Sequence, residues 1–186
     1  MAEQLSPALP PQEDVEDTYM DPLECMISSI LVNRIRSTSP VSEIVEAWQP
    51  ILVPLFTMNE GYIVRSYRQL GPGRETAKVS VKRNKRYADF LNIEFKPPSY
   101  PTSGPEFMEA RFQIGATIRW SKTTKADMIW CILCIGKNVQ FCKATKQRMM
   151  NPRLEPLHDG MLRIDRHPIT VTDLLLSIRS QVEELK

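Results

Sequence analysis

Three of the four cysteines lie between positions 131 and 142, and their spacing is close to one half of a zinc site. Cys131 and Cys134 are separated by two residues, as in zinc-binding pairs, and Cys142 and His158 are available to complete a set of four ligands. However, the pair lies inside an apolar run of strand character, where residues three apart point to opposite faces. Free cysteine is also among the most frequently buried residue types. We therefore interpret these thiols as core residues and expect no metal and no cofactor.

Catalytic motifs are missing from the sequence. It contains no Gly-rich phosphate loop, no nucleophile elbow and no paired-His metalloprotease helix. The only histidines are His158 and His167, and neither is accompanied by a recognisable catalytic partner. We therefore predict that the protein is not an enzyme.

A local surplus of positive charge is the strongest binding signal. Residues 65–86 hold eight basic residues against one acid, and a second basic group lies within residues 119–148. Lys and Arg bind phosphate or lipid head groups through charge and reach, without reading a sequence. The alternative is a solvated face on which lysines protect sheet edges. The candidate polyanion-binding residues are Arg65, Arg68, Lys78, Lys82, Arg83, Lys85, Arg86, Lys122, Lys125, Lys143, Lys146 and Arg148.

Three tyrosines are interleaved with the first basic group. Tyr62, Tyr67 and Tyr87 either stack on nucleic-acid bases or belong to the core of the strands that carry them. If the two basic groups share one face of a sheet, they form a single cationic stripe.

The sharpest short motif is a PPxY sequence formed by Pro97, Pro98 and Tyr100. WW domains bind such ligands because a polyproline-II segment loses little entropy when it docks on an aromatic groove. The motif lies in a proline-rich stretch, residues 97–107, that we predict to be an exposed loop. It is either a WW-domain ligand or a plain connector between strands.

The charge is distributed unevenly along the chain. Residues 1–24 carry seven acidic residues and no basic one, which leaves a net charge of +9 on the other 162 residues. We predict that residues 1–20 are a disordered acidic tail and not a secretory signal, because they lack a basic start and an apolar run. No stretch approaches the roughly 18 apolar residues of a membrane-spanning helix. The few cysteines indicate a reducing compartment.

Hydrophobic periodicity predicts a single α+β domain over residues 21–186. It has two N-terminal helices, about six mostly antiparallel strands and a C-terminal helix. The first helix begins at Asp21 as N-cap, and its apolar face consists of Leu23, Met26, Ile27, Ile30, Leu31 and Ile35. The second begins near Val41. The closing helix begins at Pro168 and buries Val171, Leu174, Leu175, Ile178 and Val182.

The predicted strands follow from alternating apolar and polar residues. Gly-Pro-Gly at residues 71–73 separates the first two strands. The run 128–135 fits a buried strand or a short helix, and its length favours a strand. The strand segments are 62–68, 77–82, 91–96, 112–120, 128–135 and 139–141.

A small basic α+β domain with an acidic tail, no catalytic motif and a PPxY segment resembles the matrix proteins of rhabdoviruses, in particular the shorter plant-infecting kind. In that family PPxY recruits HECT-type ubiquitin ligases through their WW domains. The basic surface binds anionic membrane and the nucleocapsid, and the protein self-associates. Only Pro97, Pro98 and Tyr100 match a family motif directly. In the animal-virus members this motif lies in a basic N-terminal tail, whereas here it is mid-chain and the tail is acidic.

The resemblance implies a non-enzymatic, matrix-like structural protein that links nucleoprotein to an anionic membrane and supports assembly and budding. Its expected partners are viral nucleoprotein or RNA, an anionic membrane surface, a WW-domain protein and further copies of itself. Its expected location is the virion and the host cytoplasm, peripheral to membrane, with the nucleus as a further site. The alternative is a nucleic-acid-binding regulator, such as a viral suppressor of RNA silencing, that uses the same basic residues.

Overall fold

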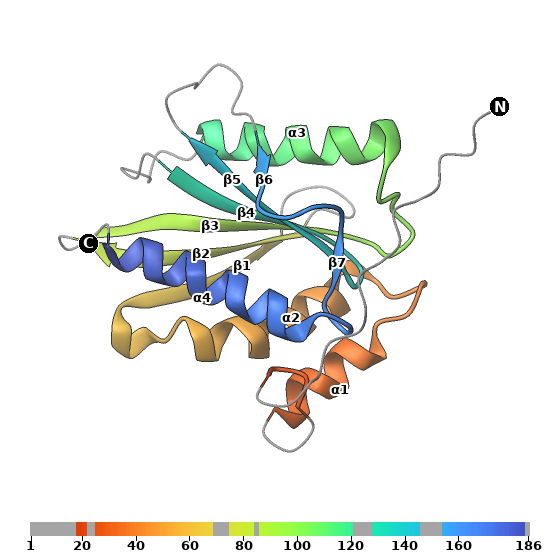
Figure 1. Ribbon diagram of the computed structural model, residues 1–186, viewed down its shortest axis with the longest axis horizontal. Helices are drawn as coiled ribbons and strands as arrows, with labels where there is room; N and C mark the ends of the chain where they lie inside the picture. The colour runs from red at the N-terminus through yellow and green to blue at the C-terminus, as the bar shows by residue number, and fades with distance from the viewer. Residues whose placement is uncertain are drawn as a thin grey trace.

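The computed structural model describes residues 18–21, 25–68, 75–83, 86–120, 128–145 and 154–184 (Figure 1). Its helices are α1 (Met26–Arg34), α2 (Val41–Leu55), α3 (Gly104–Trp120) and α4 (Pro168–Glu184), with a short 3-10 turn η1 (Met58–Glu60). Its strands are β1 (Tyr62–Arg68), β2 (Glu75–Arg83), β3 (Arg86–Lys96), β4 (Met128–Ile135), β5 (Asn138–Thr145), β6 (Glu155–Pro156) and β7 (Leu162–Arg163). The predicted α+β class, with helices at the N-terminal side and a closing C-terminal helix, is confirmed.

All described strands belong to one sheet with the order β1-β2-β3-β4-β5-β6, and β7 pairs with β5. Neighbouring strands are antiparallel except β3 and β4, which are parallel. A parallel pair needs a connection that returns across the sheet, and such crossovers are usually helical. Helix α3 is that crossover.

The predicted strand at residues 112–120 is therefore wrong. This segment belongs to α3, and Phe107, Ala110 and Ile114 are its buried residues, at helical spacing. They pack on apolar side chains of β4 and β5, including Ile129 and Leu133. The predicted loop at residues 97–107 is also too long, because α3 already begins at Gly104.

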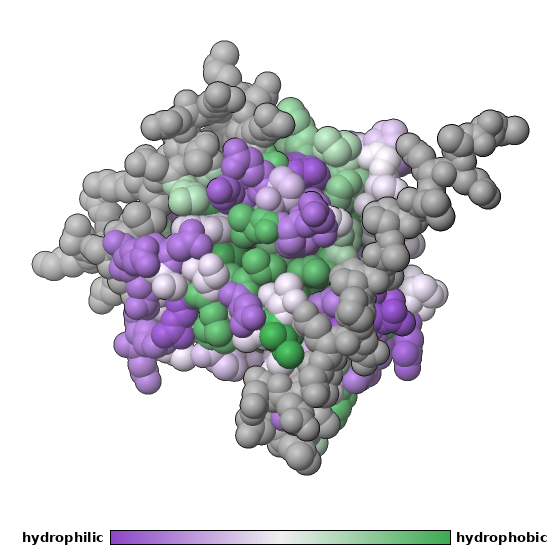
Figure 2. Space-filling view, in the orientation of Figure 1, coloured by the Kyte–Doolittle hydropathy of each residue, from purple (hydrophilic) through white to green (hydrophobic). Residues whose placement is uncertain are grey.

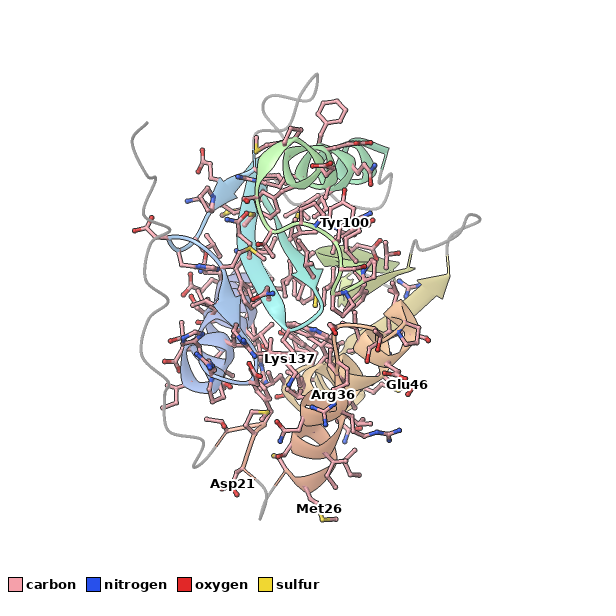
Figure 3. The ribbon with its side chains drawn as sticks, turned by 90° about the vertical axis from the view of Figure 1, so that its right-hand side faces the viewer. Asp21, Met26, Arg36, Glu46, Tyr100 and Lys137 are labelled. Carbon is pink, nitrogen blue, oxygen red and sulfur yellow. The ribbon has the colours of Figure 1, made fainter. Side chains whose placement is uncertain are left out.

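Helices α2 and α4 cover the opposite face of the sheet from α3, as Figures 1 and 3 show. The main core between them contains Trp48 and Leu52 of α2 and Leu175 of α4, each at most 1% exposed. Helix α2 continues through Pro50 and Pro54 and ends at Leu55. In Figure 2 hydrophobic side chains are visible between α3 and α4, where the strands lie behind, with hydrophilic side chains around them.

The start of the domain differs from the prediction. Helix α1 begins at Met26 and not at Asp21, which lies in a turn formed by residues 18–21. Within this turn Tyr19 is buried, and its hydroxyl donates a 2.8 Å hydrogen bond to the carbonyl of Ile164. The ordered body therefore begins before the predicted boundary at residue 20. Residues 1–17 lie outside the described part of the chain.

The predicted buried face of α1 is only partly correct. Leu31 and Ile35 pack in or against the core as predicted, and Leu23 lies outside the described residues. Met26, Ile27 and Ile30 are 59%, 65% and 49% exposed, and the helix also buries Ser28, Ser29 and Val32.

Candidate polyanion-binding surface

Strands β1 and β2 place cations of the first basic group on one face of the sheet. Tyr62 and Val64 of β1 face the core under α2 and α4, so Arg65 lies on the opposite face, which is the face that α3 occupies. Register pairs Arg65 with Lys78 of β2, and Lys78 with Asn92 of β3. Ser80 of β2 pairs with Ile63 of β1, which lies on the same face as Arg65. Lys82 follows Ser80 by two positions and therefore also lies on this face. We call these positions of the sheet register the basic face: Arg65, Tyr67, Lys78, Lys82 and Tyr87, among which the structure describes the side chain of Arg65.

Two cross-strand pairs bring like charges together. Arg65 lies opposite Lys78 on the basic face. Arg83 lies opposite Arg86 at the end of the β2–β3 hairpin, and alternation from Val81, the partner of the buried Tyr62, places this second pair on the other face. Like charges directly opposite each other destabilise an antiparallel pair. An anion bound between them removes this cost, so the register itself favours a negatively charged ligand.

A carboxylate neutralises part of the charge of one of these cations, Arg65. A side-chain nitrogen of Arg65 lies 3.3 Å from a carboxylate oxygen of Asp89, which is almost fully buried on the same face. The Arg65 side chain is 41% exposed, so it remains accessible to solvent beside this ion pair. Arg68 pairs in register with Glu75 and lies on the other face. Lys85 lies outside the described residues.

The second basic group does not extend the basic face at Lys143, the candidate of this group that the structure describes. Lys143 of β5 lies opposite Trp130, whose side chain belongs to the core on the α2 and α4 side. Lys143 is therefore on the other face, and its amino group is 3.7 Å from a carboxylate oxygen of Glu155. Both side chains are exposed, so this ion pair contributes little. The remaining candidates of this group, which are Lys122, Lys125, Lys146 and Arg148, lie outside the described residues.

Tyr62 does not belong to the binding surface. Its side chain is buried between Phe56 and Phe90, and its hydroxyl donates a 2.7 Å hydrogen bond to a carboxylate oxygen of Glu183 on α4. Burial raises the pKa of this phenol. Of the two interpretations of Tyr62, the core role is confirmed. Tyr67 and Tyr87 remain candidates for stacking because register places them on the basic face.

Polar residues of β3 form a buried cluster where α3 crosses the sheet. The amino group of Lys96 lies 3.0 Å from a carboxylate oxygen of Glu94 and donates a 3.1 Å hydrogen bond to the side-chain carbonyl of Gln113 on α3. The side chains of Glu94 and Lys96 are each only 6% exposed. The alternation of residues 91–96 predicted these side chains on a polar strand face, but it could not show that a helix covers that face.

Asn92 is a second buried polar residue that the sequence did not single out. It is 6% exposed, and neither polar atom of its amide has a hydrogen-bond partner within the described residues. A buried amide without partners costs stability. Asn92 shares a cross-strand row with Arg65 and Lys78, so this amide lies one strand from the cations.

The PPxY motif is folded into a turn. The backbone N–H of Tyr100 donates a 2.9 Å hydrogen bond to the carbonyl of Pro97, which closes the turn. The Tyr100 hydroxyl donates a 2.9 Å hydrogen bond to the carbonyl of Glu106 in the first turn of α3. The Lys96 amino group is 5.6 Å from the centre of the Tyr100 ring. The predicted extended conformation is therefore not observed, although the predicted exposure holds for Ser99 and for residues 101–106, with Pro97, Pro98 and Tyr100 half-buried. Binding of this segment to a WW domain in an extended form would require the turn to open.

Pro98 holds the motif against the neighbouring hairpin. Gly136, in the turn between β4 and β5, has a φ of +57°, and a Cβ atom there would lie 2.8 Å from the Cβ of Pro98. Glycine meets both requirements because it has no side chain and adopts this φ at little cost. The second proline of the motif thus has a packing role in the fold.

The cysteines have the environment of core residues. Cys131 and Cys142 are cross-strand neighbours under α3, whereas Cys134 lies on the other face and accepts a 3.1 Å hydrogen bond from the Trp48 indole. Burial raises the pKa of Cys134 to about 12 and that of Cys142 to about 11. The expected opposite orientation of Cys131 and Cys134 is confirmed by their separate core clusters. Among the described residues, no group of three His, Cys, Asp or Glu side chains is arranged to hold a metal ion.

Comparison with known proteins finds no matching family model, no similar curated protein and no similar solved structure. In the described part of the chain, no helix combines the length and the apolar character needed to cross a bilayer.

Proposed function

We propose that this protein is a non-enzymatic, matrix-like structural protein that links a nucleoprotein to an anionic membrane, and that the basic face binds the phosphates of the nucleoprotein RNA. The observation that carries the proposal is the register that sets Arg65 of β1 opposite Lys78 of β2 and continues to Lys82 on the same face. Like charges opposite each other are stabilised by a bound polyanion.

The type of surface supports RNA as the ligand. Single-stranded nucleic acid binds sheet faces that combine cations for the phosphates with aromatic rings for the bases. Register places Tyr67 and Tyr87 on the same face as Lys78 and Lys82, and Lys82 lies directly opposite Tyr87. A membrane surface uses the charge of such a face but not its aromatic residues.

The test measures the affinity for a single-stranded RNA oligonucleotide at several salt concentrations. The Lys78→Ala/Lys82→Ala variant removes two cations of the basic face and is expected to bind at least tenfold more weakly at low salt. If each lysine contacts one phosphate, the slope of log K against log salt falls by about 1.4, because each contact to a single strand contributes about 0.7.

The matched control is Lys143→Ala/Arg166→Ala, which removes the same charge from other parts of the surface. Both control positions lie away from the basic face, since Lys143 is on the opposite face and Arg166 precedes α4. Equal weakening by both variants would indicate that only net charge matters, and RNA binding that ignores salt would exclude phosphate contacts. Either result overturns the proposal. Binding of both variants to anionic vesicles, measured in parallel, tests the membrane contact separately.

The second candidate is a nucleic-acid-binding regulator, such as a viral suppressor of RNA silencing. The same basic face favours it, because RNA binding by this face needs neither a membrane nor self-assembly. Light scattering separates the two proposals. A matrix-like protein is expected to assemble as its concentration rises, whereas a regulator is expected to remain a monomer or dimer.

The first proposal includes two further elements. One is the docking of a WW domain on Pro97, Pro98 and Tyr100, and the other is a location at the membrane periphery of the virion and host cytoplasm.

A further inference from the structure

Helix α1 presents its apolar residues outward. A helix on a protein surface normally buries its apolar side chains and exposes its polar ones. The C-terminal part of α1 follows this rule, because Val32 is buried and Leu31 packs against the core. Its N-terminal part does the reverse, because it buries Ser28 and Ser29 while Met26, Ile27 and Ile30 are 59%, 65% and 49% exposed. We call these three residues the α1 apolar tip. Single exposed apolar residues are common on protein surfaces, but three within two turns of one helix form a patch that indicates an interaction site.

The position of α1 makes this tip accessible. Helix α1 packs mainly against α2, and Figure 1 shows it at the edge of the molecule, away from the sheet. Figure 3 shows Met26 at the extreme end of the molecule, with Arg36 and Glu46 set back towards the body. The tip is thus an apolar centre with charged side chains behind it.

The charges around the tip have both signs. Arg34 and Arg36 follow the tip at the end of α1, and Glu43 and Glu46 are exposed on the first turns of α2. An apolar centre with a polar rim is typical of protein–protein interfaces. A rim that contains both cations and anions is complementary to a second copy of itself, whereas an anionic bilayer gains no net attraction from two cations and two anions.

We propose that the α1 apolar tip is a contact between two copies of this chain, arranged around a twofold axis. A twofold contact uses the same patch on both subunits, so Ile27 and Ile30 of the two copies meet at the centre. The helix has only nine residues, so the interface is small and the association is weak and concentration-dependent. This inference extends the self-association contained in the proposed function by naming the surface that carries it.

The test is sedimentation velocity of the full chain over a concentration series. Ile27→Ser/Ile30→Ser makes the tip polar and is expected to weaken association at least tenfold, since central apolar residues dominate interface energies. The matched control is Ile169→Ser/Leu176→Ser on α4, where the two side chains are 40% and 42% exposed. The control is expected to associate like the unchanged protein. Thermal unfolding of both variants verifies that each remains folded.

A second variant tests the rim. Arg34→Glu/Arg36→Glu removes the complementarity between the two copies and is expected to weaken association, and high salt is expected to reduce the difference. Unchanged association in both the tip variant and the rim variant would overturn the inference. Loss of vesicle binding by the tip variant, with unchanged association, would also overturn it and would assign the tip to the membrane. RNA binding by the tip variant is expected to be unchanged at concentrations where the protein is monomeric, so failure of this inference is separable from failure of the basic face as an RNA site.

Discussion

The most informative single perturbation is the removal of the charge of Lys96. This side chain lies between β3, α3 and the PPxY turn, since it contacts Glu94, Gln113 and the ring of Tyr100. Lys96→Met keeps a chain of similar length and removes the ammonium group. The Glu94 carboxylate, with a side chain that is 6% exposed, then has no cation beside it.

The expected loss of stability is large for a single substitution. Removing one partner of a buried ion pair typically costs about 3–5 kcal/mol, because the remaining charge is desolvated without compensation. A domain of this size loses roughly 2–4 °C of melting temperature per kcal/mol, so the midpoint should fall by roughly 10 °C. Glu94→Met/Lys96→Met removes both charges and should recover most of the loss, since buried pairs are often replaced by apolar residues at little cost.

Urea denaturation, followed by the fluorescence of the buried Trp48 and Trp130, measures these differences. Lys143→Met is the matched control, because the same substitution there breaks an ion pair with side chains that are 41% and 56% exposed. That variant should lose less than about 1 kcal/mol. Equal losses for Lys96→Met and Lys143→Met would refute the assignment of the Lys96 pair as buried and coupled.

Three further predictions follow from the described contacts. Val32→Ala should cost about 2 kcal/mol while Ile30→Ala leaves the free energy of unfolding nearly unchanged, as measured by urea denaturation, because Val32 is buried and Ile30 is half exposed. Burial lowers the pKa of His158 below 6.5, and its Nε2 accepts a 3.0 Å hydrogen bond from the N–H of Phe141. Because the unfolded chain then binds the proton more readily, the free energy of unfolding should fall as the pH drops below about 6.5, and this fall should be absent in His158→Gln. Tyr100→Phe should cost about 1 kcal/mol through its lost hydroxyl bond, and a WW domain should bind the free PPSY peptide more tightly than the intact chain, as measured by calorimetry.

Hydrophobic periodicity correctly predicted the elements whose apolar side chains all pack on one face against the core. The strands from 62 to 96, the apolar face of α2 and the buried residues of α4 follow from the spacing of apolar residues, and all are observed. The same reasoning failed for the first half of α1, where Met26, Ile27 and Ile30 were assigned to the core although they face outward. Periodicity locates an apolar face but does not say whether this chain or another molecule covers it.

The segment 112–120 failed for a different reason. Phe112, Ile114, Ala116, Ile118 and Trp120 alternate with period two, so the local pattern fits a strand. What makes this segment a helix is the parallel pairing of β3 with β4, because it requires a crossover between them. Pairing between strands that are distant in the sequence is not contained in a local pattern. The buried cluster of Glu94, Lys96 and Gln113 was missed for the same reason, since it exists only because α3 crosses there.

The position of α3 also explains how one polar sheet face comes to have two different roles. At the end of β3 that α3 covers, Glu94 and Lys96 are buried and neutralise each other. Towards the β2–β3 hairpin, register sets Arg65 opposite Lys78, Lys82 follows on the same face, and Asp89 is the acid that offsets Arg65 there. A polar strand face under a helix must satisfy its charges internally, whereas a face beyond the helix can leave them for a ligand. The boundary between the two is set by where the crossover passes, so the location of the basic face is a consequence of the topology that the sequence pattern alone did not reveal.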